Sequence, residues 1–176
     1  MNNFFSVSHT NNAVNVNTSI EVKTLIQDKV VFGGLIGVLA NISMNILQFP
    51  IWKLKIIKHP LSHYAASIFL EPQDLHHMMI GSIVSFLADY IYGAFLGVIF
   101  VYIIYLTGKN FLIIKGLIFG SFLWVFSFGG LGSLPIVTLQ EVISADTIYY
   151  LLFHLVFGIT LGILVKKYGE QALKKT

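Results

Sequence analysis

Four long apolar runs, separated by stretches that carry the charged residues, constrain this chain more than any other feature of its sequence. A helix needs about 20 mostly apolar residues to cross the hydrocarbon core of a bilayer. The chain is 56% hydrophobic and 11% charged, whereas soluble domains carry about 25% charged residues. The sequence therefore predicts an all-α polytopic membrane protein whose four transmembrane helices cover residues 30–52, 78–106, 111–128 and 147–165.

Residues 1–18 are polar and hold six asparagines. Such a composition predicts a mobile tail rather than packed structure. Thr18 and Glu21 match the capping box that begins a helix, so we expect a helix from about Ser19 onward. The membrane bundle should then cover residues 19–167.

Residues 53–77 connect the first two spans and are too polar to cross a membrane. Pro60 suits the first turn of a helix, and a short apolar patch follows it. This pattern favours a short interfacial helix that lies on the lipid headgroups. At the other end of the chain, residues 168–176 form a basic C-terminal tail.

Every basic residue is a lysine, and the lysines are divided unevenly between the two sides of the predicted bundle. The side that holds both termini carries Lys23, Lys29, Lys109, Lys166, Lys167, Lys174 and Lys175. The opposite side carries Lys53, Lys55 and Lys58. Because lysine is enriched in cytoplasmic loops, we expect a protein of the cell membrane with both termini in the cytoplasm.

Several classes of function lack their sequence signatures. The chain has no cysteine, which excludes disulfides and thiolate metal sites, and no basic stripe that would bind nucleic acid. It contains no His-Glu-x-x-His, Gly-x-Ser-x-Gly or phosphate-loop motif. We therefore expect a non-enzymatic protein with no catalytic residues and no cofactor. Its expected partners are the lipid bilayer and other membrane chains, either copies of itself in a homo-oligomer or subunits of a membrane complex.

Each predicted span carries two glycines four residues apart, which lie on one side of a helix. Small residues at this spacing let helix backbones approach closely within a membrane. The expected packing residues are Gly33, Gly37, Gly93, Gly97, Gly116, Gly120, Gly158 and Gly162. Glycine is frequent in membrane spans generally, but four pairs at similar depth favour close packing.

Four polar residues are expected between the midplane and the outer surface: Asn41, Asn45, Asp89 and His154. A charged acid at the bilayer centre costs about 3 kcal/mol, so Asp89 should face the bundle and be protonated or paired. His154 is its obvious partner, with Asn41 and Asn45 as hydrogen-bonding neighbours, and ionisable residues inside a membrane are functional hypotheses by default. The alternative is that a neutral Asp89 bonds an asparagine or a tyrosine, a neutral His154 bonds a backbone carbonyl, and both serve only packing.

The second and fourth spans share a register of one polar residue and two glycines: Asp89, Gly93 and Gly97, and His154, Gly158 and Gly162. The first and third spans share the triplet Gly-Leu-Ile, at 34–36 and 116–118. A duplicated two-helix unit would explain both similarities, as in transporters built from parallel repeats. Matching the triplets sets Gly37 opposite Phe119, however, so chance similarity between glycine-rich spans is the alternative.

Four histidines of the first connector, together with Glu71 and Asp74, offer ligands of the kind that bind zinc: His59, His63, His76 and His77. If Pro60 starts a helix, His59 and His63 need not share a face, and their spacing is generic. Polar side chains at a headgroup interface are the simpler interpretation.

A further pattern consists of Lys115-Gly116 with Gly120, followed by His154 with Gly158 and Gly162. It resembles small four-span membrane proteins of Bacillota, the YqhR-like and YagU-like groups, over roughly residues 30–165. The resemblance implies a four-helix inner-membrane protein, with no established activity or ligand.

Three hypotheses of function follow from these patterns. The first is a small oligomeric transporter-like or channel-like unit, with Asp89 and His154 in a polar cavity of the outer half. The second is a structural or accessory subunit that anchors a partner, in which these residues only pack. A third is a membrane metal-binding protein or metalloenzyme.

Overall fold

The computed structural model describes residues 27–77, 79–139 and 146–174. This part of the chain is all-helical, and four of its helices are long and apolar enough to cross a membrane. They are α2 (Lys29–Lys53), α5 (Met79–Thr107), α6 (Leu112–Val125) with its continuation to Ser133, and α7 (Asp146–Tyr168). The predicted all-α polytopic fold with four transmembrane helices is confirmed.

The helices begin within one residue of the predicted span starts, but the third span ends differently. Its glycines are expected to break the helix after residue 128. The chain instead continues as the π-helix η1 (Phe126–Gly130) and the 3-10 helix η2 (Leu131–Ser133). These wider and tighter turns keep the backbone hydrogen-bonded across the glycines. The polar tail and the helix start expected near Ser19 lie outside the described residues.

The first connector holds two short helices, α3 (Leu61–Ala66) and α4 (Pro72–His77), where one helix is expected. Pro60 is the N-cap of α3 rather than part of its first turn. The α3 helix packs against α5, and its His63 and Ala66 side chains are buried. Part of the apolar patch of this connector therefore covers α5, while Ile68 and Phe69 remain exposed.

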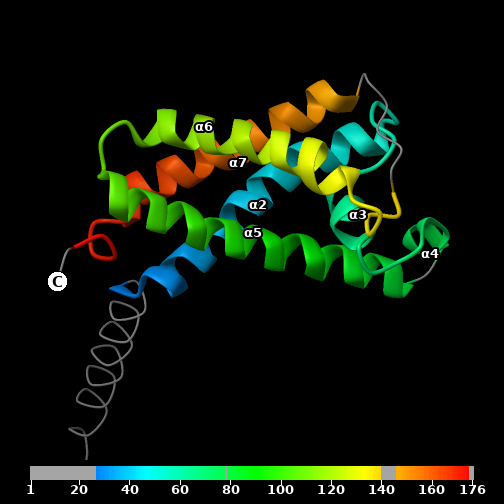
Figure 1. Cartoon of the computed structure of the whole chain (residues 1–176), viewed down its shortest axis with the longest axis horizontal. Coiled ribbons are helices and arrows are strands. Elements are labelled where there is room, and N and C mark those ends of the chain that lie inside the picture. The colour runs from blue at the N-terminus through cyan, green and yellow to red at the C-terminus, as the bar shows by residue number, and fades with distance from the viewer. Residues whose placement is uncertain (1–26, 78, 140–145, 175–176) are drawn as a thin grey trace, which may run out of the picture.

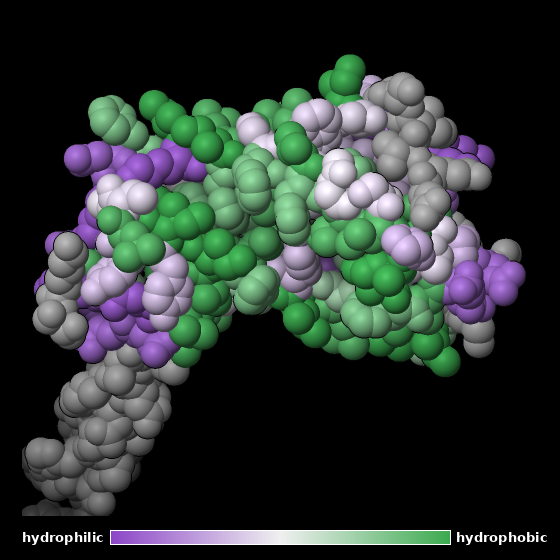
Figure 2. All heavy atoms as spheres, viewed as in Figure 1, coloured by the Kyte–Doolittle hydropathy of each residue, from purple (hydrophilic) through white to green (hydrophobic). Residues whose placement is uncertain are grey.

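The long helices run up and down between two ends of the molecule (Figure 1). At the terminal end, α2 begins, a short link joins α5 to α6, and α7 ends; at the connector end lie α3, α4 and η2. Figure 2 shows apolar side chains across the middle and polar side chains gathered at both ends. Ile46, Ile91 and Ile118, in three of the long helices, are 71%, 67% and 64% exposed. Exposed apolar side chains at mid-helix are those that contact lipid in a membrane protein.

Helices α2 and α5 approach each other at glycines. A Cβ atom added to Gly33 would lie 2.6 Å from Val98 Cα, and one added to Gly37 would overlap the carbonyl oxygen of Gly93. Similarly, a Cβ on Gly97 would overlap the Gly33 carbonyl oxygen. Because no side chain separates the backbones here, the helices gain dispersion contacts that water expulsion cannot supply within lipid.

Helices α6 and α7 cross in the same way. A Cβ on Gly116 would overlap the carbonyl oxygen of Gly158, and a Cβ on Gly158 would overlap that of Gly116. A Cβ on Gly162 would lie 2.7 Å from the Leu112 carbonyl oxygen. Each glycine of this crossing therefore faces backbone rather than side chain.

The two helix pairs use equivalent contacts: Gly37 with Gly93 and Gly97 with Gly33 in the first pair, Gly116 with Gly158 and Gly162 with Leu112 in the second. In this register Asp89 is equivalent to His154, which is the correspondence that the glycine spacing of these spans indicates. Asn41 is equivalent to Gly120, where a Cβ would overlap the His154 carbonyl oxygen. The Gly-Leu-Ile triplets do not occupy equivalent positions. The bundle is thus built from two similar pairs, α2–α5 and α6–α7.

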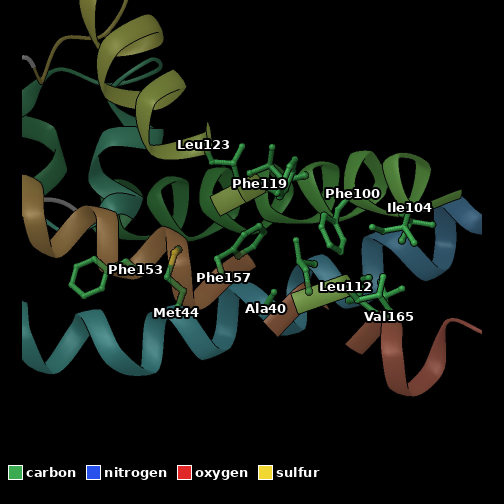
Figure 3. Close-up of a cluster of buried hydrophobic side chains, with 14 of the residues drawn as sticks. Ala40, Met44, Phe100, Ile104, Leu112, Phe119, Leu123, Phe153, Phe157 and Val165 are labelled. Atoms are coloured by element: carbon green, nitrogen blue, oxygen red, sulfur yellow. The ribbon is translucent and has the colours of Figure 1, made fainter. Parts of the chain in front are cut away.

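Buried apolar side chains fill the space between the helices along the bundle and up to its terminal end (Figure 3). The rings of Phe100 on α5 and Phe119 on α6 have centroids 5.3 Å apart. Ile104, Leu112 and Val165 extend this cluster, and all five side chains are buried. The two helix pairs therefore meet through an apolar core at this end.

Lys115 secures the link between α5 and α6. Its Nζ donates to the carbonyl oxygens of Thr107 at 3.1 Å and Gly108 at 2.8 Å, and to Thr107 Oγ1 at 3.0 Å. These groups lie at the carboxyl end of α5, where a positive charge is favourable.

Gly97→Val should lower the free energy of unfolding by about 2 kcal/mol or more, because the new side chain would push the α2 backbone away. Gly34→Val is the matched control, since a Cβ at Gly34 meets nothing within 4 Å. Thermal unfolding of the purified proteins in detergent, followed by circular dichroism, compares them. Equal Tm values for the two variants would contradict the close approach of α2 and α5.

Candidate functional site

A cleft of about 790 Å³ lies between α5 on one side and the end of α6 with η1 and η2 on the other. Its walls come from residues 84–96 and 123–133. Met44 of α2 and Phe157 of α7 contribute to its floor, and α3 closes the connector end with residues that include Tyr64. This volume lies in the range of sites that bind small molecules.

Part of the cleft lining belongs to the exposed apolar surface of α5. Leu87, Ile91 and Phe95 line the cleft and are 52%, 67% and 61% exposed. All three lie in the middle turns of α5, which places them at the depth of the acyl chains in a membrane. This part of the lining is therefore continuous with the apolar surface that is expected to face lipid.

Asp89 is held at the floor of the cleft by side chains of α2. Asn41 Nδ2 donates to Asp89 Oδ2 at 2.7 Å, and Asn45 Nδ2 donates to the same oxygen at 2.9 Å. Gln48 Nε2 donates to Asn45 Oδ1, and Gln48 Oε1 accepts from Leu61 N at 3.0 Å. We call the three α2 side chains, Asn41, Asn45 and Gln48, the polar ladder; all are buried. The ladder connects the start of α3 to the acid.

His154 lines the same cleft but bonds to its own helix. Its Nδ1 lies 2.7 Å from the carbonyl oxygen of Tyr150, and because a carbonyl can only accept, Nδ1 is the donor. Phe128 meets its ring edge-on, with centroids 6.1 Å apart. No hydrogen bond joins His154 to Asp89 within the described residues, so the pairing expected from the sequence is not formed. The reason is that α5 packs mainly against α2, whose amides reach Asp89.

A comparison of equivalent positions in the two helix pairs explains why Asp89 bonds to the facing helix and His154 does not. On α6, Gly120 stands where α2 has Asn41, and Trp124 stands where α2 has Asn45. Glycine offers no side-chain donor, and the Trp124 Nε1 hydrogen has no acceptor in the part of the chain that the structure describes. His154 therefore finds its partner one turn back on α7.

An aromatic cluster closes the connector end of the cleft. The Tyr150 ring stacks on Phe128, with centroids 4.9 Å apart and an interplanar angle of 10°. Tyr64 packs edge-on against Tyr150 at 5.5 Å. Tyr150 Oη donates to the carbonyl oxygen of His59 at 2.9 Å, which ties the connector to α7.

No three His, Asp or Glu side chains within residues 27–75, 79–139 and 146–174 could hold a metal ion. His59 and His63 are buried, with ring centroids 6.2 Å apart and planes tilted by 46°. His63 also packs edge-on against Trp52. The side chains of His76 and His77, in α4, lie outside the description.

Three residues that build this region were not predicted from the sequence. Gln48 lies about one helical turn after Asn45, and Tyr150 lies one turn before His154. Their spacing from these polar residues could have indicated both. Asp146 Oδ2 accepts a hydrogen bond from Lys58 N at 2.9 Å. Nothing in the sequence relates two residues so far apart.

No family model, curated protein or solved structure matches this chain. The chemistry of the cleft is therefore what indicates function. That chemistry consists of one acid held by two amides, one histidine held by a carbonyl, and mostly apolar walls.

Asn45→Leu should lower the free energy of unfolding by about 2 kcal/mol, because it removes one donor from Asp89 and the acceptor of Gln48. In an Asp89→Leu background, Asn45→Leu should lower the free energy of unfolding by a smaller amount. The difference between the two losses, which is the coupling energy of the two positions, should be at least about 0.5 kcal/mol. Denaturant unfolding of the four proteins in detergent measures this coupling.

Asn110→Leu, in the exposed link between α5 and α6, is the control and should leave stability unchanged. Strictly additive effects of Asn45→Leu and Asp89→Leu would show that the polar ladder does not hold the acid.

Proposed function

We propose that this protein is a non-catalytic protein of the cell membrane, with both termini in the cytoplasm, that binds a small apolar or amphipathic molecule in the cleft as one unit of a transporter-like oligomer. The observation that carries the proposal is a buried acid in a largely apolar cleft of about 790 Å³. Ligand sites combine apolar walls with a few placed polar groups. An ionisable residue inside a membrane is expected to serve a function.

The closed inner end of the cleft favours a transporter-like unit over a channel. Leu96, Leu123 and Phe157 form its last lining toward the terminal end. Beyond them, Phe100 and Phe119 are buried and in contact. A channel needs a continuous path lined by groups that replace water around an ion. The described residues beyond the cleft form an apolar core, which fits a site that is open on one side at a time.

The repeat supports the same proposal. Transporters built from repeats place their sites at the repeat interface, near the bilayer midplane. Asp89 and His154 occupy equivalent positions in the two helix pairs, and both line the cleft between them. Each pair thus contributes one ionisable group to the site.

A second candidate, a structural subunit that anchors a membrane partner, is favoured by one observation. Asp89 and His154 both have hydrogen-bond partners inside the protein, as purely structural polar residues do. A helix of the partner would then fill the cleft. Membership of the YqhR-like and YagU-like groups, which the Lys115 and His154 motifs favour, is compatible with either function.

Orientation can be tested with single cysteines, because the natural chain has none. Ser133→Cys at the connector end should react with a membrane-impermeant maleimide on intact cells. Lys109→Cys, in the link at the terminal end, should react only after the cells are permeabilised, since the lysine-rich end is expected inside. The reverse pattern would place the termini outside the cell.

Access to the cleft can be tested with serine-to-cysteine changes, which alter one atom. Ser127→Cys lines the cleft and should react with a small permeant maleimide several-fold faster than Ser85→Cys. Ser85 is 4% exposed and does not line the cleft, so it reports a packed site on α5. Reaction rates measured by mass spectrometry compare the two.

Ser121→Cys is a second control, because Ser121 lies on α6 outside the cleft and its hydroxyl bonds the Leu117 carbonyl oxygen. Equal, slow reaction at Ser127→Cys, Ser85→Cys and Ser121→Cys would mean that the cleft is filled. That outcome would favour the structural subunit over the binding unit.

A further inference from the structure

One oxygen of the buried acid is without a donor. Both amides of the polar ladder donate to Asp89 Oδ2, and Oδ1 accepts no hydrogen bond from the described residues. The side chain is 5% exposed and lines the cleft. Oδ1 is therefore accessible to a hydrogen-bond donor that enters the cleft, and a charged donor makes the stronger bond to it.

Among the described residues, the lining of the cleft contains no lysine and one acidic residue, Asp89. The rings of Tyr64, Tyr92 and Phe128 line the same space, and the faces of such rings attract cations. A cationic group would stabilise the ionised form of Asp89 and meet aromatic rings here, whereas an anionic group would meet the same acid and no lysine.

His154 adds an acceptor to the same cleft. Its Nδ1 hydrogen is used by the Tyr150 carbonyl oxygen, so in the neutral ring Nε2 carries a lone pair. An ammonium group has three donors and no acceptor. The unused acceptors of Asp89 and His154 therefore suit an ammonium better than they suit a carboxylate or a phosphate.

The apolar walls of the cleft indicate what the rest of the ligand should be. Exposed Leu87, Ile91 and Phe95 line it at the depth of the acyl chains. A ligand that reaches Asp89 from this side passes between apolar walls along its whole length. An apolar chain attached to the polar head satisfies those walls.

We propose, on the basis of the function proposed above, that the cleft binds an amphiphilic amine. The ammonium donates to Asp89 Oδ1, and the apolar chain runs between α5 and η1 into the bilayer. A free long-chain amine and the head group of an aminophospholipid share this chemistry. Either molecule enters from the membrane rather than from water.

The test uses the full-length protein in phosphatidylcholine nanodiscs and dodecylamine that carries a photoreactive diazirine on its chain. The matching dodecanol probe is the control, because it has the same chain and no charge. Crosslinked residues are mapped by mass spectrometry. The amine probe should label residues 84–96 and 123–133, and unlabelled dodecylamine should compete.

Asp89→Asn should reduce labelling by the amine probe at least about fivefold, because it removes the charge from the hydrogen bond. The same variant keeps an acceptor oxygen for the amides of Asn41 and Asn45, and its Tm verifies that it folds. Labelling by the dodecanol probe should be alike in the natural protein and in Asp89→Asn.

Ala88→Trp provides a second variant that leaves the acid untouched. Ala88 lines the cleft, so the added ring should abolish labelling by both probes. Ile83→Trp is its matched control, because Ile83 is 50% exposed on the same helix and does not line the cleft. It should leave labelling unchanged.

The outcomes separate the two proposals. Absence of cleft labelling by both probes would overturn the proposed function together with the amine. If both probes label the cleft equally and Asp89→Asn does not change that labelling, the proposal of an amine ligand is wrong, but the proposed function stands. Phosphatidylethanolamine in the nanodiscs identifies the source: suppression of amine labelling supports a lipid head group, and undiminished labelling supports a free amine.

Discussion

The bundle depends on the absence of side chains where its helix backbones cross. Within lipid, burying apolar surface does not draw helices together, because the acyl chains are equally apolar. Direct backbone contact at Gly37 and Gly93, and again at Gly116 and Gly158, supplies dispersion instead. The same contacts fix the register within each pair. They also set the depth of the ionisable residues, since Asp89 and His154 each lie one turn before the second-helix glycine of a crossing.

Two pairs with the same crossing carry different side chains around it. On α2, amides lie opposite the acid, whereas the equivalent positions of α6 hold Gly120 and Trp124. Toward the terminal end the pairs meet through Phe100 and Phe119, and toward the connector end the cleft separates α5 from η1. The repeat therefore provides the scaffold, and the departures from it make the site. The functional proposals rest on one of these differences between the pairs: Asp89, whose Oδ1 accepts no hydrogen bond from the described residues.

Much of the scaffold could be predicted from the sequence, because span length, hydropathy and glycine spacing are local properties. The four spans, their starts and the equivalence of Asp89 with His154 all follow from such patterns. Which helix each face meets is not local. For this reason the sequence left open whether Asp89 bonds His154 or an asparagine, and it did not reveal that α3 folds back on α5. Orientation, oligomeric state and ligand stay predictions, because they depend on molecules outside the chain.

The pairing of the glycines can be measured directly by magic-angle-spinning NMR in lipid, on protein labelled only at its 15 glycines. Two glycine-packed pairs predict inter-helix correlations between the α carbons of Gly37 and Gly97 and between those of Gly116 and Gly158. They predict none between Gly37 and Gly116. Correlations that join the glycines of α2 to those of α6 would contradict the two-pair bundle and the cleft that it creates.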